Sequence, residues 1–244
     1  MAKKEDGDLA RMPLLQRSAA EGVGTAFLLI AVVGSGIMAE RLCGGNVGLA
    51  LLANSTATGA GLIALILAFG QLSGAHFNPA VTLADASLGG IAWKDAPWYI
   101  AAQISGAFAG VGAANLMFND PVFFVSHRVR AGSGQILGEF IATFGLLAVI
   151  WGCARLRSSA VPFAVGAYIA GAYWFTSSTS FANPAVTLAR AVTDTFAGIR
   201  WSDVPAFVIA QLVGAAAATL FLWWLIPSLP KMATNVLARN GDIK

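Results

Sequence analysis

One heptapeptide, Asn-Pro-Ala-Val-Thr-Leu-Ala, occurs twice in this chain, at positions 78–84 and again at positions 183–189. Asparagine and proline are costly inside a lipid bilayer, yet both copies lie in apolar surroundings and at corresponding places in the two halves of the chain. Self-similarity of this kind indicates a duplicated architecture. The repeat therefore predicts two halves of similar structure that together form a symmetric pore.

The composition is that of an integral membrane protein. Hydrophobic residues make up 57% of the chain, charged residues 11%, and the mean hydropathy is +0.71, whereas about a quarter of the residues of a soluble protein are charged. The net charge of +3 is spread over flanks and loops, so no basic face for nucleic acid is expected. Cys43 and Cys153 lie in different halves without metal-ligand spacing and are interpreted as small apolar residues. No metal and no cofactor are expected.

Six apolar stretches approach the length of about 20 residues that a helix needs to cross a bilayer. They are residues 19–39, 47–70, 97–117, 135–155, 160–175 and 203–226. Two further runs, 78–88 and 183–196, are too short to cross, and we expect them to be re-entrant half-helices. The predicted fold is all-α, with six transmembrane helices and two re-entrant half-helices.

The chain is expected to form one channel domain over residues 19–226, between an N-terminal segment at 1–18 and a C-terminal tail at 227–244. Repeat one covers about 19–117 and repeat two about 135–226. Each repeat has three spans, so the two have opposite topologies, and inverted repeats of this kind place the functional site near the bilayer midplane.

Lysine and arginine predict the orientation, because cytoplasmic loops carry the excess of positive charge. On the side of both termini lie Lys3, Lys4, Arg11, Arg17, Lys94, Arg155, Arg157, Lys231, Arg239 and Lys244. On the opposite side lie Arg41, Arg128, Arg130, Arg190 and Arg200. Both termini are therefore predicted to be cytoplasmic, and the short loops suit a bacterial inner membrane.

Other polar residues recur in the same order as the heptads. The pattern Glu-x-x-x-Thr begins at Glu21 and again at Glu139, and Ala-Gln-x-x-Gly contains Gln103 and Gln211. A carboxylate inside a span is usually paired, so each glutamate is predicted to accept hydrogen bonds from the backbone of a re-entrant loop, with the glutamines bracing the same loops. A role in proton coupling is the alternative for the two glutamates.

Each heptad has the features of a helix start. Asn78 and Asn183 are N-cap residues, and Pro79 and Pro184 suit the first helical turn, ahead of Ala80 and Ala185. The residues just before must then be non-helical, which membrane proteins tolerate only along a wet cavity. Their carbonyl groups are predicted to form a ladder of acceptors, contributed by Gly74, Ala75, His76, Phe181 and Ala182. Two helix N-termini at the centre would repel cations, and the asparagine amides would donate to a neutral hydroxylated solute.

The stretch from Ser73 to Thr82, Ser-Gly-Ala-His-Phe-Asn-Pro-Ala-Val-Thr, together with the second heptad and the paired Glu and Gln residues, resembles the aquaporin superfamily of major intrinsic proteins. The resemblance covers about residues 19–226. It implies a homotetramer in the lipid bilayer, with one pore per subunit and passive passage of water or small neutral solutes.

One departure from the family pattern bears on the solute. The family usually has an arginine after the second Asn-Pro-Ala, and this chain has Val186. Alignment by family offsets places Thr58, Gly171 and Ser180 at the other constriction positions, so the filter is expected to be wider and less polar. It resembles bacterial channels for trivalent metalloid hydroxides: arsenite, antimonite and methylarsenite. A general glycerol and water channel is the alternative.

Several residues permit two interpretations. Arg190, one helical turn after Val186, either reaches back toward the outer vestibule or is a solvated surface arginine, and Asp85 is its counterpart near the inner mouth. His76 and His127 are interpreted as a loop-packing residue and a surface residue, and a pH gate at either histidine is the alternative.

Other functional classes fit the sequence less well. A secondary transporter would need an acidic cluster at the midplane beyond the two glutamates. A structural membrane protein would need larger exposed loops. No nucleophile with an adjacent base is evident, so an enzyme is not expected.

Overall fold

The computed structural model describes residues 12–226, apart from the side chains of Arg155 and Leu156. The predicted C-terminal tail and most of the predicted N-terminal segment lie outside the described residues. The described residues are helical with irregular connections. Repeat one contains α1 (Leu14–Leu29), η1 (Ile30–Gly34), α2 (Ser35–Leu42), α3 (Val47–Ser73), α4 (Pro79–Ser87) and α5 (Ala96–Met117). Repeat two contains α6 (Ser133–Leu156), η2 (Ser158–Ala160), α7 (Val161–Phe175), α8 (Pro184–Ala189), η3 (Arg190–Val192), η4 (Trp201–Asp203) and α9 (Val204–Leu225).

The predicted fold class of six spanning helices and two half-helices is confirmed. Among the described residues, five helical segments are long and apolar enough to cross a membrane, the first being the continuous helix Leu14–Leu42. The sixth predicted span is α7, which has 15 residues and continues into the non-helical segment 176–182. The half-helices are α4 and α8.

The second half-helix is shorter than predicted. The sequence predicts a run over 183–196, but α8 ends at Ala189 and η3 follows it. The chain turns back there, because the carbonyl oxygen of Arg190 accepts a hydrogen bond from the backbone N–H of Ile199. Apolar composition alone did not reveal this turn.

The continuous first helix contains a π-helical turn, Ile30–Gly34. Such a turn disturbs the regular hydrogen bonding of the helix. The buried side chain of Asn54, on α3, donates from Nδ2 to the carbonyl oxygen of Val32 at 2.8 Å and to Oγ of Ser35 at 2.8 Å. A polar residue inside a span is thus used to stabilise an irregular helix.

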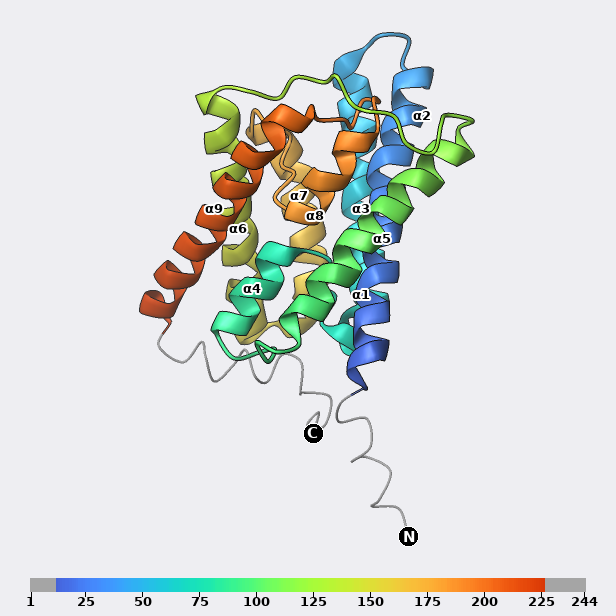
Figure 1. Ribbon diagram of the computed structural model, residues 1–244. Helices are drawn as coiled ribbons and strands as arrows, with labels where there is room; N and C mark the ends of the chain where they lie inside the picture. Colours follow the sequence, from blue (N-terminus) through green and yellow to red (C-terminus); the bar gives the residue numbers. More distant parts are fainter. Residues whose placement is uncertain (1–11, 227–244) are drawn as a thin grey trace.

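The two repeats pack alike. Helix α1 lies against α5, α6 lies against α9, and α3 packs on α7 across the repeats, while α4 and α8 occupy the centre (Figure 1). Glycines permit the closest crossings: a Cβ at Gly106 would lie 2.1 Å from the carbonyl oxygen of Gly22, and one at Gly214 would lie 2.6 Å from that of Phe140. We call the end where α1 begins and α9 ends the inner end, and the opposite end the outer end.

Candidate functional site: a central pore

The two half-helices begin face to face at the centre of the molecule. The Oδ1 atoms of Asn78 and Asn183 accept from the N–H groups of Ala80 at 2.9 Å and Ala185 at 3.0 Å, so both asparagines are N-caps. Their Nδ2 atoms reach across: Asn78 donates to the carbonyl oxygen of Ala182 at 2.7 Å, and Asn183 donates to that of Phe77 at 2.7 Å. The two repeats are therefore tied together by a reciprocal pair of hydrogen bonds.

Glu21 holds the first re-entrant loop. Its carboxylate is fully buried and accepts from the N–H groups of His76 at 2.9 Å and Phe77 at 2.6 Å. It also accepts from Oγ of Ser73 at 2.6 Å and from Nε2 of Gln103 at 2.8 Å. With four donors, this carboxylate is accommodated inside the membrane protein.

Glu139 holds the second loop in the same way. It accepts from the N–H groups of Phe181 and Ala182, both at 2.9 Å, and from Nε2 of Gln211 at 2.6 Å. The Thr side chain one turn after each glutamate bonds back to the carbonyl oxygen of that glutamate, at 2.7 Å for Thr25 and 2.9 Å for Thr143. The duplicated Glu-x-x-x-Thr and Gln positions thus serve two equivalent braces.

The braced loops have unusual backbones. Ala75 and Phe77 in one loop, and Ser180 and Ala182 in the other, have φ near +50°, a left-handed conformation that L-residues seldom adopt. Alternation with ordinary residues turns successive N–H groups to one side, as in an anion-binding nest, and here a Glu carboxylate occupies that side. The carbonyl groups consequently face the other way, toward the cavity.

A cavity of about 120 Å³ runs through the centre, with room for several water molecules. The five residues predicted for the carbonyl ladder all line it: Gly74, Ala75, His76, Phe181 and Ala182. Both pore asparagines line it as well. The rest of its wall is largely apolar, with Leu62, Val81, Ile150 and Trp151 among the lining residues.

Three of the four predicted filter residues line this cavity, namely Thr58, Ser180 and Val186. Gly171 does not: a Cβ added there would meet the ring of Phe175 at 3.7 Å. Four α7 residues line the cavity: Val161, Val165, Ile169 and Tyr173. They are spaced one helical turn apart and therefore share one face of the helix. The Tyr173 hydroxyl lies 3.3 Å from Oγ1 of Thr58. On α7, Tyr173 therefore lines the cavity in place of the predicted Gly171.

Arg190 is buried at the outer end of the cavity, so its interpretation as a solvated surface arginine is wrong. It is 2% exposed and lines the cavity. Its Nε donates to the carbonyl oxygen of Ala197, and its Cζ lies 3.4 Å from the ring centroid of Phe181. The reason is the turn after α8, which wraps residues 193–199 over the arginine instead of leaving it at a helix end in water.

A second arginine, Arg130, reaches the same place from residues 118–132, which join α5 to α6 and are called the outer connection, and was missed as a site residue. It donates to the carbonyl oxygens of Gly198 at 2.7 Å and Ser178 at 3.2 Å, and its Cζ lies 4.9 Å from the Phe181 ring centroid. Over residues 12–226, neither Arg130 nor Arg190 forms an ion pair. The outer end of the cavity is therefore positively charged.

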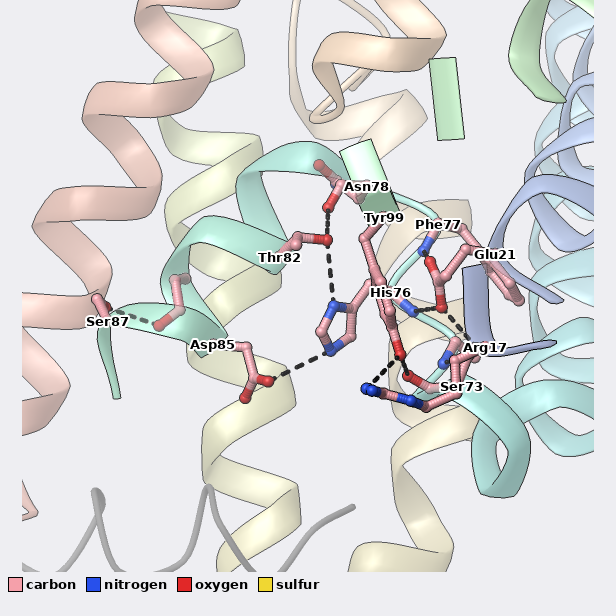
Figure 2. Close-up of polar contacts among 12 residues, drawn as sticks. Arg17, Glu21, Ser73, His76, Phe77, Asn78, Thr82, Asp85, Ser87 and Tyr99 are labelled. Atoms are coloured by element: carbon pink, nitrogen blue, oxygen red, sulfur yellow. Dashed lines mark hydrogen bonds and ion pairs between the residues drawn. The ribbon is translucent and has the colours of Figure 1, made fainter. Parts of the chain in front are cut away.

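The inner end of the cavity carries the opposite charge. Asp85, at the last turn of α4, lines the cavity and is 3% exposed. Its Oδ2 lies 3.5 Å from Nε2 of His76, whose Nδ1 lies 3.1 Å from Oγ1 of Thr82 (Figure 2). His76 also packs on the ring of Tyr99, with 5.6 Å between ring centroids. Asp85 and Arg190 each follow the heptad of their own repeat directly. This shared position was the sequence signal that the two residues lie at opposite ends of the cavity.

His127 lies outside the pore, as expected for a surface residue. It is exposed, and both its N–H group and its ring bond to Asp194. The backbone hydrogen bond from His127 is the main cause that lowers the pKa of the Asp194 carboxyl below its usual range. This pair anchors the outer connection rather than lining the cavity.

Comparison with known proteins agrees with this geometry. The sequence pattern described as "Major intrinsic protein" matches residues 8–170 and 154–242. The chain is 52% identical to aquaglyceroporin AqpS of Rhizobium meliloti, over 89% of this chain and 93% of that one. It is 33% identical to aquaporin NIP1-1 of Oryza sativa, over 84% and 72%. The crystal structure of the aquaglyceroporin from Plasmodium falciparum has the same fold, with a TM-score of 0.65, 22% identity, and coverage of 90% and 100%.

A six-span inverted repeat whose half-helices meet at a narrow central cavity defines a passive, multi-pass membrane channel for small solutes. The match over both halves of the chain then places the protein: it belongs to the major intrinsic protein family. Members of this family are channels, and the prediction that the protein is not an enzyme is confirmed.

Proposed function

We propose that this channel passes neutral trivalent metalloid hydroxides, namely arsenite, antimonite and methylarsenite, together with glycerol and some water. The observation that carries the proposal is Val186, a buried isopropyl side chain in the outer part of the cavity wall. An arginine there would add five N–H donors and a fixed charge at the constriction. A valine leaves an apolar wall that suits a solute of glycerol size and low polarity.

Hydroxyl groups elsewhere in the cavity lining support the same proposal. Thr58 and Tyr173 line the cavity with hydroxyl groups 3.3 Å apart, and Oγ of Ser180 is buried without a hydrogen-bond partner among the described residues. An amphipathic constriction of this kind can hydrogen-bond the hydroxyl groups of a solute on one side and contact its less polar side with Val186. A relative at 52% identity is named an aquaglyceroporin, which supports passage of solutes larger than water.

The alternatives have less support. A general glycerol and water channel uses the same pore and differs in solute ranking alone. A secondary transporter needs carboxylates free to bind a coupling ion, whereas Glu21 and Glu139 each accept three or more hydrogen bonds as loop braces. The same contacts argue against a proton-coupling role for these glutamates.

The membrane arrangement also belongs to this proposal. The distribution of lysine and arginine supports cytoplasmic termini, with α4 entering from the cytoplasmic side and α8 from the outside. A bacterial relative supports a bacterial inner membrane. The homotetramer with one pore per subunit is proposed from the family resemblance.

Uptake into proteoliposomes tests the solute. Water, glycerol, neutral trivalent arsenite and methylarsenite are compared by stopped-flow and tracer assays for the native protein, Val186→Arg and the control Val129→Arg. Val129 is 62% exposed in the outer connection, so its variant introduces the same charge outside the cavity.

We expect Val186→Arg to lower arsenite and glycerol permeability by about tenfold or more while water permeability changes much less, since about 1.4 kcal/mol of added barrier suffices. Val129→Arg should leave all four unchanged. Unaltered solute ratios in Val186→Arg would show that position 186 does not control the constriction.

A further inference from the structure

The inner end of the cavity contains two hydrogen-bond acceptors without protein donors. Neither carboxylate oxygen of Asp85 accepts a hydrogen bond from residues 12–226, and Oδ2 is buried. The nearest candidate, Nε2 of His76, lies 3.5 Å away, beyond the ordinary N–H···O range of 2.7–3.2 Å. Figure 2 shows both side chains at the inner end of the half-helix, with Asp85 pointing toward the imidazole. A buried carboxylate in this state needs a donor from elsewhere.

The hydrogen bonds of Thr82 indicate which nitrogen of His76 carries the proton. Oγ1 of Thr82 accepts from Nε2 of Gln103 at 2.9 Å and lies 3.1 Å from the carbonyl oxygen of Asn78, to which it can donate. Its single proton is then used. The contact at 3.1 Å to Nδ1 of His76 must therefore be an N–H donated by the imidazole.

The second repeat supports this assignment. Oγ1 of Thr187 accepts from Nε2 of Gln211 at 2.8 Å and donates to the carbonyl oxygen of Asn183 at 2.8 Å. No histidine competes there, since Phe181 is the residue at the position of His76. The same threonine proton therefore goes to the asparagine carbonyl in both repeats. A neutral His76 is left with an Nε2 lone pair that no donor among the described residues occupies.

The other charged groups around His76 do not supply the missing donor. From α1, the Glu21 carboxylate bonds the backbone N–H of His76, and Arg17 bonds Asp95 and the hydroxyl of Tyr99. From α5, Tyr99 presents its ring to the imidazole, while its hydroxyl donates to the carbonyl oxygen of Ser73. Across the cavity, the described lining residues of α6 and α7 near this end carry no charge and include Ala154, Val161 and Trp151. The buried Nε1 of Trp151 is a donor without a partner among the described residues, and no hydrogen bond joins it to Asp85 or His76.

We propose that Asp85 and His76 form a binding site at the inner end of the pore for a neutral solute with two hydroxyl groups on one atom or on adjacent atoms. This inference rests on the proposed function and names the part of the solute that is recognised there. One hydroxyl donates to the carboxylate and the other to Nε2, across the 3.5 Å that separates the two acceptors. Glycerol and arsenous acid both have this arrangement of hydroxyl groups, whereas water has a single oxygen.

The test uses glycerol as the probe, because a solute that occupies a narrow pore reduces water flow through it. Water permeability of proteoliposomes is measured with an impermeant osmolyte while glycerol is equal on both sides, and the half-blocking glycerol concentration is determined. The variants are Asp85→Asn, His76→Gln and the control Asp120→Asn. Asp120 is a carboxylate in the outer connection, paired with Arg41 away from the cavity.

Asp85→Asn is expected to raise the half-blocking concentration about tenfold, the effect of losing one charge-assisted hydrogen bond. His76→Gln is expected to raise it several-fold, and Asp120→Asn is expected to leave it unchanged.

An unchanged half-blocking concentration in both Asp85→Asn and His76→Gln would overturn the site while leaving the proposed function intact. Normal glycerol block of water flow without any uptake of glycerol or arsenite would overturn the proposed function and support the site. A native protein that passes neither water nor glycerol nor arsenite would overturn both.

Discussion

The two re-entrant loops share their asparagine caps and their glutamate and glutamine braces, and they differ in charge at the residue that follows the shared heptad. Each begins with an Asn N-cap that bonds across to the other loop, and each is held by a buried glutamate and a glutamine. The residue after the shared heptad is Asp85 in one loop and Arg190 in the other, and both are buried against the same cavity. Duplication thus accounts for the scaffold, while the residues that are not duplicated determine the chemistry of each end.

Asp85 and Arg190 also interact differently with the helix dipoles of their half-helices. The C-terminal end of a helix favours a cation and disfavours an anion. Arg190 therefore suits the end of α8, whereas Asp85 adds negative charge to the end of α4. A solute that crosses the pore meets donors near the outer end and acceptors near the inner end. The comparison can be tested at four levels, beginning with the braces that the two loops share.

The largest effect is expected from removing a brace. Glu21→Leu leaves two backbone N–H groups and Oγ of Ser73 without their acceptor, and Glu139→Leu leaves two backbone N–H groups. Each change should destabilise the protein by about 3–5 kcal/mol, with Glu21→Leu the more severe. Heat survival in detergent, followed by size-exclusion chromatography, measures this. Equal losses would mean that Ser73 adds nothing to the first brace.

Substitutions at the two helix crossings should also destabilise the first repeat more than the second. Gly106→Ala places a Cβ 2.1 Å from a backbone oxygen, and Gly214→Ala places one at 2.6 Å, so the first repeat should suffer more, each by about 1–3 kcal/mol. Gly152→Ala is the control, because nothing lies within 4 Å of its Cβ. The same heat-survival assay applies. A Gly214→Ala protein less stable than Gly106→Ala would contradict the expected order.

Removing the charged residue at each end of the cavity should have different effects on proton leak. Arg190→Met removes a buried cation that has no ion-pair partner among residues 12–226. Proton leak through the pore should therefore rise about tenfold, which corresponds to about 1.4 kcal/mol of lost repulsion. Asp85→Asn should not raise it. A pH-sensitive dye inside proteoliposomes reports the leak. An increase in both variants would show that the sign of the charge is not what excludes protons.

The smallest effect concerns the outer connection, which has no counterpart in this structure at the inner end. Because the folded-state pKa of Asp194 is lowered, its contribution to stability is present above the unfolded value of about 3.9 and is lost as the pH falls through the folded value. The carboxylate is one-third exposed, so the contribution should be about 0.5 kcal/mol or less. Thermal unfolding of the native protein and Asp194→Asn should differ near neutral pH and converge in acid.

The sequence predicted the elements that depend on local chemistry. The Asn-Pro starts of α4 and α8 follow from N-capping and from the missing N–H of proline, and Glu21 and Glu139 were placed against the loops because a carboxylate in a span needs donors. Positions that depend on packing were not predictable. Gly171 was chosen by family offset, but the rotation of α7 brings Tyr173 to the cavity instead. The burial of Arg190 depends on a turn whose hydrogen bond joins residues 190 and 199.

The reciprocal bonds between Asn78 and Ala182, and between Asn183 and Phe77, also constrain the order of events during synthesis. The first re-entrant loop leaves the ribosome before its partner exists, by roughly 5–20 s at ordinary translation rates. Throughout that interval the amide of Asn78 and the carbonyl group of Phe77 lack their final partners. The hydrogen bonding of the first loop is therefore completed only after the second loop has been synthesised.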